Sequence, residues 1–232
     1  FLKIWYTRFN QLNESEDIKM DILETMKARH SVRQYKNQAI ESSKREKINA
    51  LIKDVNAESK LSIQVFYDEP KCFDSFMAHY GKFENVKNYI AIVGNKNDQE
   101  KAGYYGEKIV LKCQKLGLNT CWVAMTHGKS KAQIKRGQKL LIIISLGYGE
   151  TQGVPHKSKS IAELGQADQK NEWFEKGMEA VSLAPTAVNQ QKFYFELKNG
   201  IVTAKNLGGF YSRIDLGIVK YHFEVVTGHE VK

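Results

Sequence analysis

Two short apolar runs constrain the fold of this chain most strongly. The segments "NYIAIVGN" (88–95) and "KLLIIISLGYG" (139–149) are almost continuously apolar, which is typical of strands buried on both faces. No apolar run of the sequence reaches the ~18 residues that a membrane span needs. We therefore predict buried strands here, with further strands in "LSIQVFYD" (61–68) and "TCWVAM" (120–125).

The clearest helical pattern lies between these strands, in "QEKAGYYGEKIVLKCQKLGLN" (99–119). Apolar residues recur there at helical spacing, and Gly117 suits the end of a helix. Those residues are Ala102, Tyr105, Ile109, Cys113 and Leu116. Further helices are predicted over 20–30, 44–56, 171–183 and 214–226. In the second of these, Ile48, Leu51 and Ile52 are expected to face inward.

The chain divides most naturally in the polar region that follows "GYGETQGVPHKSK" (147–159). Beyond it, Asn199-Gly200 separates two alternating segments and predicts a hairpin. The order of elements suggests an approximate internal repeat, which we treat as a hypothesis. The predicted parts are 1–19, an upstream extension or an expression remnant, then 20–167 and 168–232 as two similar halves.

Charge and cysteine content narrow the possible functions without choosing one. The 232 residues carry a formal charge of +9, which favours anionic partners such as nucleic acid, phosphorylated cofactors or an acidic membrane. Three cysteines without a CxxC pair argue against a disulfide framework and a zinc site. We expect a cytoplasmic protein.

Most local motifs allow an unremarkable structural explanation. "ARHSVRQYK" (28–36) could bind a phosphate, because arginine offers a planar fork of donors, or it could be a solvated basic turn. The basic stretch 129–139 could contact nucleic acid, but it lacks interleaved aromatics, so a solvated helix face is favoured. The histidines lack metal-binding spacing, and no GxGxxG, Walker A or GxSxG motif occurs. We predict no metal site and no catalytic side chain.

Five segments taken together resemble the nitroreductase family of FMN-dependent flavoproteins. They are "ARHSVRQY", "GYYGEKIVLKCQKLGLNTCWVA", "ISLGYGE", "APTAVNQQ" and "IDLGIVKYHFEV", and the likeness covers roughly residues 20–227. The resemblance is strongest to a branch in which one chain carries two subunit-like halves. It implies an α+β fold with a central antiparallel sheet wrapped by helices.

The resemblance also implies where a cofactor would bind. In the family's homodimers, an Arg-x-Ser-x-Arg segment of one subunit holds the FMN phosphate, and an Ala-Pro-Ser-x-x-Asn segment of the other lies against the flavin. Here the first motif occurs only early and the second only late, with Thr186 in place of serine. One FMN per chain is therefore expected. The implied cofactor-binding residues are Arg29, His30, Ser31, Arg33, Ala124, Met125, Lys157, Lys159, Pro185, Thr186, Ala187, Asn189 and Gln190.

The implied activity is ping-pong transfer of electrons from NADH or NADPH to a nitroaromatic, quinone or similar small molecule. The expected partners exclude nucleic acid and membrane, and the chain is expected to be a monomer, as an internal pseudo-dimer, or a homodimer. Three alternatives stay open: a flavin-binding or flavin-processing homologue without this activity, a homologue that has lost flavin, and a basic nucleic-acid-binding module.

Overall fold

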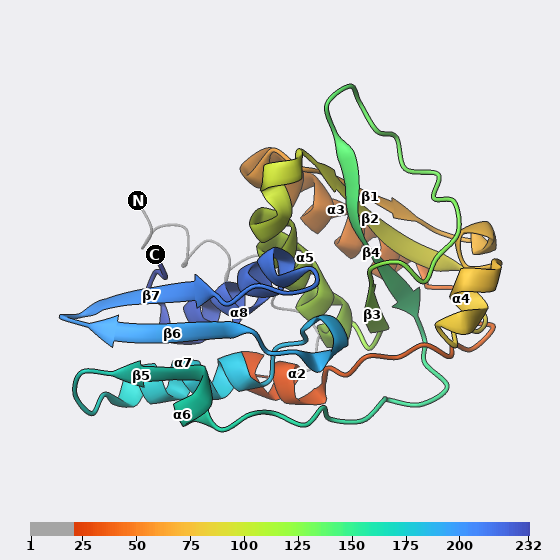
Figure 1. The fold of residues 1–232 in the computed structure, drawn as a ribbon. Helices are drawn as coiled ribbons and strands as arrows, with labels where there is room; N and C mark the ends of the chain where they lie inside the picture. The colour runs from red at the N-terminus through yellow and green to blue at the C-terminus, as the bar shows by residue number, and fades with distance from the viewer. Residues whose placement is uncertain (1–20) are drawn as a thin grey trace.

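Two β-sheets lie on either side of a central pair of helices (Figure 1). The computed structural model describes residues 21–232, and the predicted extension 1–19 lies outside them. The α+β class with a helix-covered antiparallel sheet is confirmed. Among the described residues, no helix is both long enough and apolar enough to cross a membrane.

Most elements lie where the sequence pattern predicts them. The helices are α2 (Ile22–Ala28), α3 (Ser42–Ser59), η1 (Pro70–Cys72), α4 (Phe76–Tyr80), η2 (Lys96–Asp98), α5 (Gln99–Lys115), α6 (Ile161–Leu164), α7 (Glu172–Ser182), η3 (Ala187–Asn189) and α8 (Ser212–Thr227). The strands are β1 (Ser62–Phe66), β2 (Asn88–Gly94), β3 (Asn119–Val123), β4 (Lys139–Gly147), β5 (Gly165–Ala167), β6 (Phe193–Lys198) and β7 (Ile201–Asn206).

The larger sheet has the order β1-β2-β4-β3 and is antiparallel throughout. Its continuous apolar runs are explained by burial of both faces. Along β2, Ile90 and Ile92 belong to the main core with residues of α3 and α5. Tyr89 and Ala91 point the other way, into a smaller core that includes Phe73. The pleat thus sends alternate side chains into two different apolar layers.

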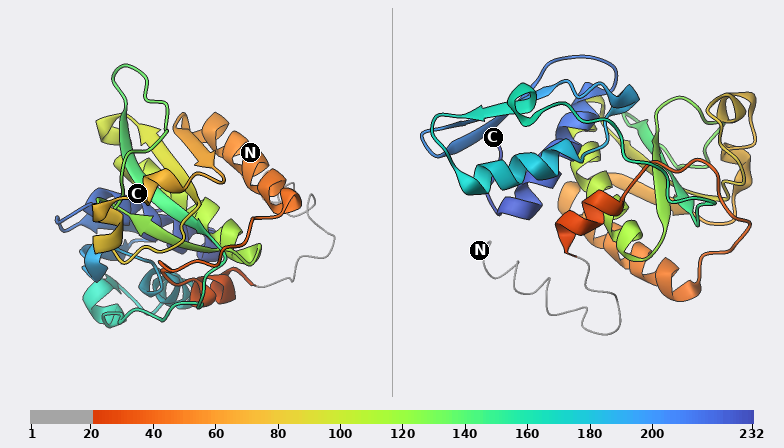
Figure 2. Two further views of the ribbon diagram at one scale, coloured as in Figure 1. Left: turned by 90° about the vertical axis from the view of Figure 1, so that its right-hand side faces the viewer. Right: turned by 90° about the horizontal axis from the view of Figure 1, so that it is seen from below.

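Helices α5 and α8 cross closely enough that only glycine fits at the contact. A Cβ at Gly103 would lie 2.0 Å from the carbonyl oxygen of Ile214, and one at Gly217 would lie 1.9 Å from that of Glu100. The contact is reciprocal. Gly103 meets residue 214, three positions before Gly217, and Gly217 meets residue 100, three positions before Gly103. The right-hand view in Figure 2 shows these helices side by side in the middle of the molecule.

The smaller sheet has the order β5-β6-β7. Its β6–β7 hairpin confirms the predicted turn, since Asn199 and Gly200 both have positive φ, as a type I′ turn requires. Strand β5 pairs with β6 in parallel and has no counterpart in the predictions.

The basic stretch 129–139 is not the solvated helix face that was favoured. It forms a loop from β3 that turns into the start of β4. Two backbone N–H groups of this loop donate to side chains outside it. The Lys131 N–H donates to the Tyr89 hydroxyl, and the Gln133 N–H donates to Oε1 of Gln64. Bonds of this kind compete with a helical hydrogen-bond ladder.

Candidate functional site

Arg29 is the most unusual of the predicted site residues. It follows α2 directly with extended backbone, and only 3% of its surface is exposed. Its Nε and Nη1 atoms are buried without a hydrogen-bond partner. A buried donor without a partner is costly, so an incoming acceptor group with several oxygens, such as a phosphate, fits this guanidinium.

Glu107 of α5 is the acidic residue beside Arg29. Its Oε1 lies 3.9 Å from Nε of Arg29 and 3.0 Å from Nε2 of His222, and its Oε2 accepts from the Trp122 indole at 3.0 Å. Burial would raise the pKa of Glu107, but the hydrogen bond and charge of His222, followed by the Arg29 charge, leave the pKa lowered. The carboxylate is therefore ionised and compensates part of the arginine charge.

Residues 30–33 run along β3. Ser31 forms a parallel bridge with Thr120, whose carbonyl accepts from the N–H of Val32 at 3.0 Å. The Ser31 side chain is exposed, and His30 is half-buried, with its pKa lowered by burial and then by the Arg29 charge. The exposed Arg33 lies over Phe83, 6.0 Å from the ring centroid. Arg29 is thus the buried member of this group, and Ser31 and Arg33 are its exposed members.

The segment 153–159 joins the early and late motifs. On one side, a Cβ at Gly153 would lie 2.8 Å from that of His30. On the other, His156 Nε2 lies 3.1 Å from the Ser182 carbonyl oxygen. Burial lowers the pKa of His156, and the charges of Arg29 and His30 lower it further. Figure 1 shows this segment passing beside the chain that follows α2.

The late motif forms a loop with unusual backbone conformation. Val188, Asn189 and Gln191 all have positive φ, and at the β-branched Val188 this is a genuine outlier. Val188 is also 83% exposed, so no packing of its side chain accounts for the strain. Such strain is concentrated at functional loops.

Lys157 and Lys159 hold this loop through backbone groups and through the Lys159 ammonium. The Lys157 carbonyl accepts from Asn189 Nδ2 and Gln191 Nε2, each at 2.9 Å. The Lys159 N–H donates to Oε1 of Gln191 at 2.8 Å, and its Nζ donates to the Gln191 carbonyl at 3.1 Å. The side chains of both lysines are exposed.

Asp215, in the first turn of α8, anchors the same loop from the other side. Its Oδ1 accepts from the Ala187 N–H at 2.9 Å, and its Oδ2 from Gln190 Nε2 at 2.7 Å. Burial raises the pKa of Asp215 to about 6, and these two hydrogen bonds oppose the rise. Pro185 and Thr186 enter the loop half-buried, and the Thr186 hydroxyl accepts from the Gln191 N–H.

Ala124 and Met125 lie where β3 ends, and residues before α8 connect them to the loop. The Tyr211 hydroxyl donates to the Ala124 carbonyl at 3.4 Å. Gln190 donates to the carbonyl of the neighbouring Phe210 at 2.6 Å. Met125 is exposed, so its side chain is available at this end of the sheet.

The structure therefore connects the predicted segments through 153–159, β3 and residues 210–215. Two surface hollows of about 450 and 240 Å³ lie elsewhere, and no predicted site residue lines either. The predicted site thus combines the buried Arg29 with half-buried and exposed groups. No group of three or more metal-ligating side chains occurs among residues 21–232.

Sequence reasoning missed residues that hold the site together. They are Glu107, His156, Gln191, Tyr211, Asp215 and His222. The sequence carries a signal for three of these. Glu107, Asp215 and His222 are polar residues on largely apolar, buried helix faces. A polar group on such a face needs a partner, and that requirement marks it for attention.

Comparison with known proteins gives one family match. A family profile described as "Putative TM nitroreductase" matches residues 21–227. A solved structure from Thermotoga maritima MSB8, described as a putative nitroreductase, is 22% identical with a TM-score of 0.66, over 95% of this chain and 91% of that one. This likeness shows the fold.

Two other solved structures are less similar. A Desulfovibrio desulfuricans protein, described as a putative nitroreductase in complex with FMN, is 15% identical with a TM-score of 0.49, over 63% of this chain and 95% of its own. An FMN-dependent nitroreductase from Clostridium difficile R20291 is 21% identical with a TM-score of 0.44, over 60% of this chain and 92% of its own. A search of curated proteins gave no match.

Proposed function

Because this chain belongs to the nitroreductase family, we propose that it is an FMN-dependent oxidoreductase. In this proposal it passes electrons from NADH or NADPH to nitroaromatic, quinone or similar acceptors. The observation that supports it best is Arg29, a buried guanidinium with two unpartnered nitrogen atoms, which suits the phosphate of FMN.

Each predicted segment has a role in this proposal. Arg29 binds the FMN phosphate as a charge-assisted donor, and the exposed Ser31 and Arg33 add donors beside it. Loop 185–191 presents backbone and amide groups to the flavin ring, held in place by Asp215 and Lys157. The Ala124–Met125 backbone approaches the reactive edge of the ring.

Bound FMN supplies the hydride and electron chemistry, and the protein supplies position and electrostatics. This explains why no catalytic dyad is needed. In this proposal donor and acceptor use the same face in turn, which predicts ping-pong kinetics. The formal charge of +9 attracts the phosphates of both FMN and NAD(P)H.

The test begins with the absorbance spectrum of the purified protein and with FMN titration of the flavin-free form. We expect oxidised-flavin bands, followed by NADH or NADPH oxidation that depends on menadione or nitrofurazone. Parallel double-reciprocal plots against the acceptor would agree with ping-pong turnover. Bound FMN without turnover would identify a flavin-binding homologue instead. Failure to bind FMN at all would overturn the proposal.

A further inference from the structure

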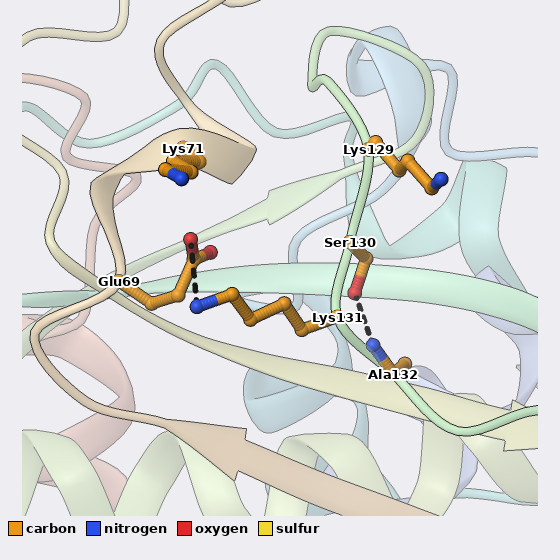
Figure 3. A pocket seen from close by; sticks show the side chains of 6 residues that line it. All are labelled: Glu69, Lys71, Lys129, Ser130, Lys131 and Ala132. Atoms are coloured by element: carbon orange, nitrogen blue, oxygen red, sulfur yellow. Dashed lines mark hydrogen bonds and ion pairs between the residues drawn. The ribbon is translucent and has the colours of Figure 1, made fainter.

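A second candidate site lies away from the predicted FMN face, in the hollow of about 450 Å³. Figure 3 shows its lining, in which Glu69 and Lys131 point toward each other. The full lining is Glu69, Lys71, Lys129, Ser130, Lys131 and Ala132. One wall is the turn into η1, and the other is the loop after β3.

Glu69 is the residue that points to a ligand. Its surface is only 4% exposed, and both carboxylate oxygens are buried without a hydrogen-bond partner. The Nζ of Lys131 lies 3.6 Å from Oε1, which is an ionic contact beyond ordinary hydrogen-bond length. A buried carboxylate needs donors, and the hollow is where they can enter.

Hydrogen bonds hold the two walls of the hollow in place without a ligand. The Gly128 N–H donates to the Cys72 carbonyl at 2.6 Å, and the Lys131 N–H donates to the Tyr89 hydroxyl at 3.0 Å. The Glu69 N–H donates to the Lys87 carbonyl at 2.7 Å. A preorganised site of this kind loses little entropy when it binds.

The charges around the hollow select the class of ligand. A simple anion would suit Lys71, Lys129 and Lys131 but would leave Glu69 without donors. A simple cation would suit Glu69 but would be repelled by the lysines. A ligand with neighbouring hydroxyl donors and a separate anionic group satisfies both. A ribose phosphate has this combination, since its vicinal hydroxyls can donate to both carboxylate oxygens.

We propose that this hollow binds the ribose phosphate of an adenosine nucleotide, with the hydroxyls on Glu69 and the phosphate on Lys71. Resting on the proposed function, we assign it to the adenosine half of NADH, whose ribose keeps both hydroxyls, whereas that of NADPH carries a phosphate on one of them. Lys129 lies five positions after Ala124, and that length of chain spans at most about 18 Å. An extended dinucleotide can therefore reach from the hollow toward the predicted flavin edge.

The direct test measures binding of AMP and 2′-deoxy-AMP to the full chain by titration calorimetry. We expect AMP to bind about tenfold more tightly, the effect of one hydrogen bond to a charged group. Glu69→Gln should remove most of this preference, and Lys71→Ala should weaken both nucleotides severalfold. The matched control is Lys135→Ala, which removes the same charge from the same loop outside the hollow, and it should change neither affinity. Equal affinity for the two nucleotides, absence of AMP binding, or an equal loss in the control would overturn the proposal.

A kinetic test separates this proposal from the proposed function. Lys71→Ala should raise KM for NADH severalfold and leave KM for reduced nicotinamide mononucleotide unchanged, because the latter has no adenosine half. If both donors are affected equally, the hollow is not the adenosine site although the enzyme is active. If FMN binding and turnover fail but AMP discrimination holds, the hollow is a nucleotide site and the proposed function is wrong.

Discussion

At the scale of single residues, the environment of Arg29 is the most unusual feature of the predicted site. The guanidinium is buried beside Glu107, yet two of its nitrogen atoms have no acceptor. Glu107 accepts hydrogen bonds from His222 and Trp122, and its contact with Arg29 is an ion pair at 3.9 Å. Two nitrogen atoms of Arg29 thus remain without a hydrogen-bond partner.

Arg29→Ala should weaken FMN binding by about 1.5–3 kcal/mol, the size of a charge-assisted hydrogen bond. Arg29→Lys should also weaken it, because an ammonium keeps the charge but loses the planar fork. Fluorescence titration of flavin-free protein with FMN measures both. Lys27→Ala is the control, since Lys27 is a nearby cation with exposed partners Glu24 and Glu179. Unchanged affinity in Arg29→Ala, or an equal loss in the control, would contradict the phosphate assignment.

Asp215 should give folding a distinct pH dependence. Its pKa is raised from 3.8 to about 6 in the folded chain, so the folded state binds the proton more tightly than the unfolded state. The contribution of Asp215 to the free energy of unfolding is complete below pH 4 and is lost as the pH rises to about 6. The shift corresponds to roughly 3 kcal/mol.

Urea unfolding between pH 4 and 7 tests this prediction. Relative to Asp215→Asn, the wild type should lose free energy of unfolding as the pH rises, because only the wild type must bury a charge. Two parallel pH profiles would show that Asp215 keeps an ordinary pKa in the fold.

Sequence analysis identified Arg29 but not its burial or its partner. Arg29 stands in a recognisable local motif, whereas Glu107 is 78 positions further on and meets it only through packing of α2 against α5. Likewise, Gln190 was predicted within its motif, but its acceptor Asp215 lies 25 positions away. Local patterns show which groups are unusual, and the tertiary fold decides what they contact.

At the scale of elements, periodicity predicts the long helices and the apolar strands well. The helix over 99–115 and the turn at Asn199-Gly200 follow directly from spacing and turn chemistry. Strand β5 could not be predicted, because its three residues carry no alternation and pair only with the later β6. The loop 129–139 was misjudged because hydrogen bonds to Tyr89 and Gln64 outweigh its local helical pattern.

The α5–α8 crossing yields a prediction at this scale. Gly103→Ala should destabilise the chain by about 1–3 kcal/mol, since the added methyl group meets the Ile214 backbone and no rotamer change can relieve the contact. The better helix propensity of alanine offsets up to about 1 kcal/mol of this loss. Thermal and urea unfolding measure the net change.

Gly106→Ala on the same helix is the comparison. There the added methyl group meets the side chains of Trp122 and Ile92 rather than backbone atoms. A smaller loss is therefore expected. If Gly103→Ala is neutral or stabilising, the two helices do not cross as closely as the structure shows.

At the scale of the whole molecule, the arrangement of the two predicted motifs determines how many complete sites one chain is expected to form. The motif 29–33 occurs once, near the start, and the motif 184–189 occurs once, in the other predicted half. Segment 153–159 lies between the two and contacts both. Within the proposed function, one chain therefore forms one complete site.

We expect one FMN per chain, measured as released flavin against protein concentration after denaturation, with mass from light scattering to define the oligomer. Double Arg29→Ala/Arg33→Ala protein should lose this flavin. A ratio near two would show that a second face of the molecule also binds the cofactor.

The reciprocal glycine contact has an evolutionary consequence. In an assembly of two identical subunits, every substitution is imposed on both sides of the symmetry axis at once. Here the two glycines of the contact, 103 and 217, are encoded separately, so selection can preserve one side of the crossing and alter the other. The two faces of this chain are therefore free to diverge in sequence, which identical subunits cannot do.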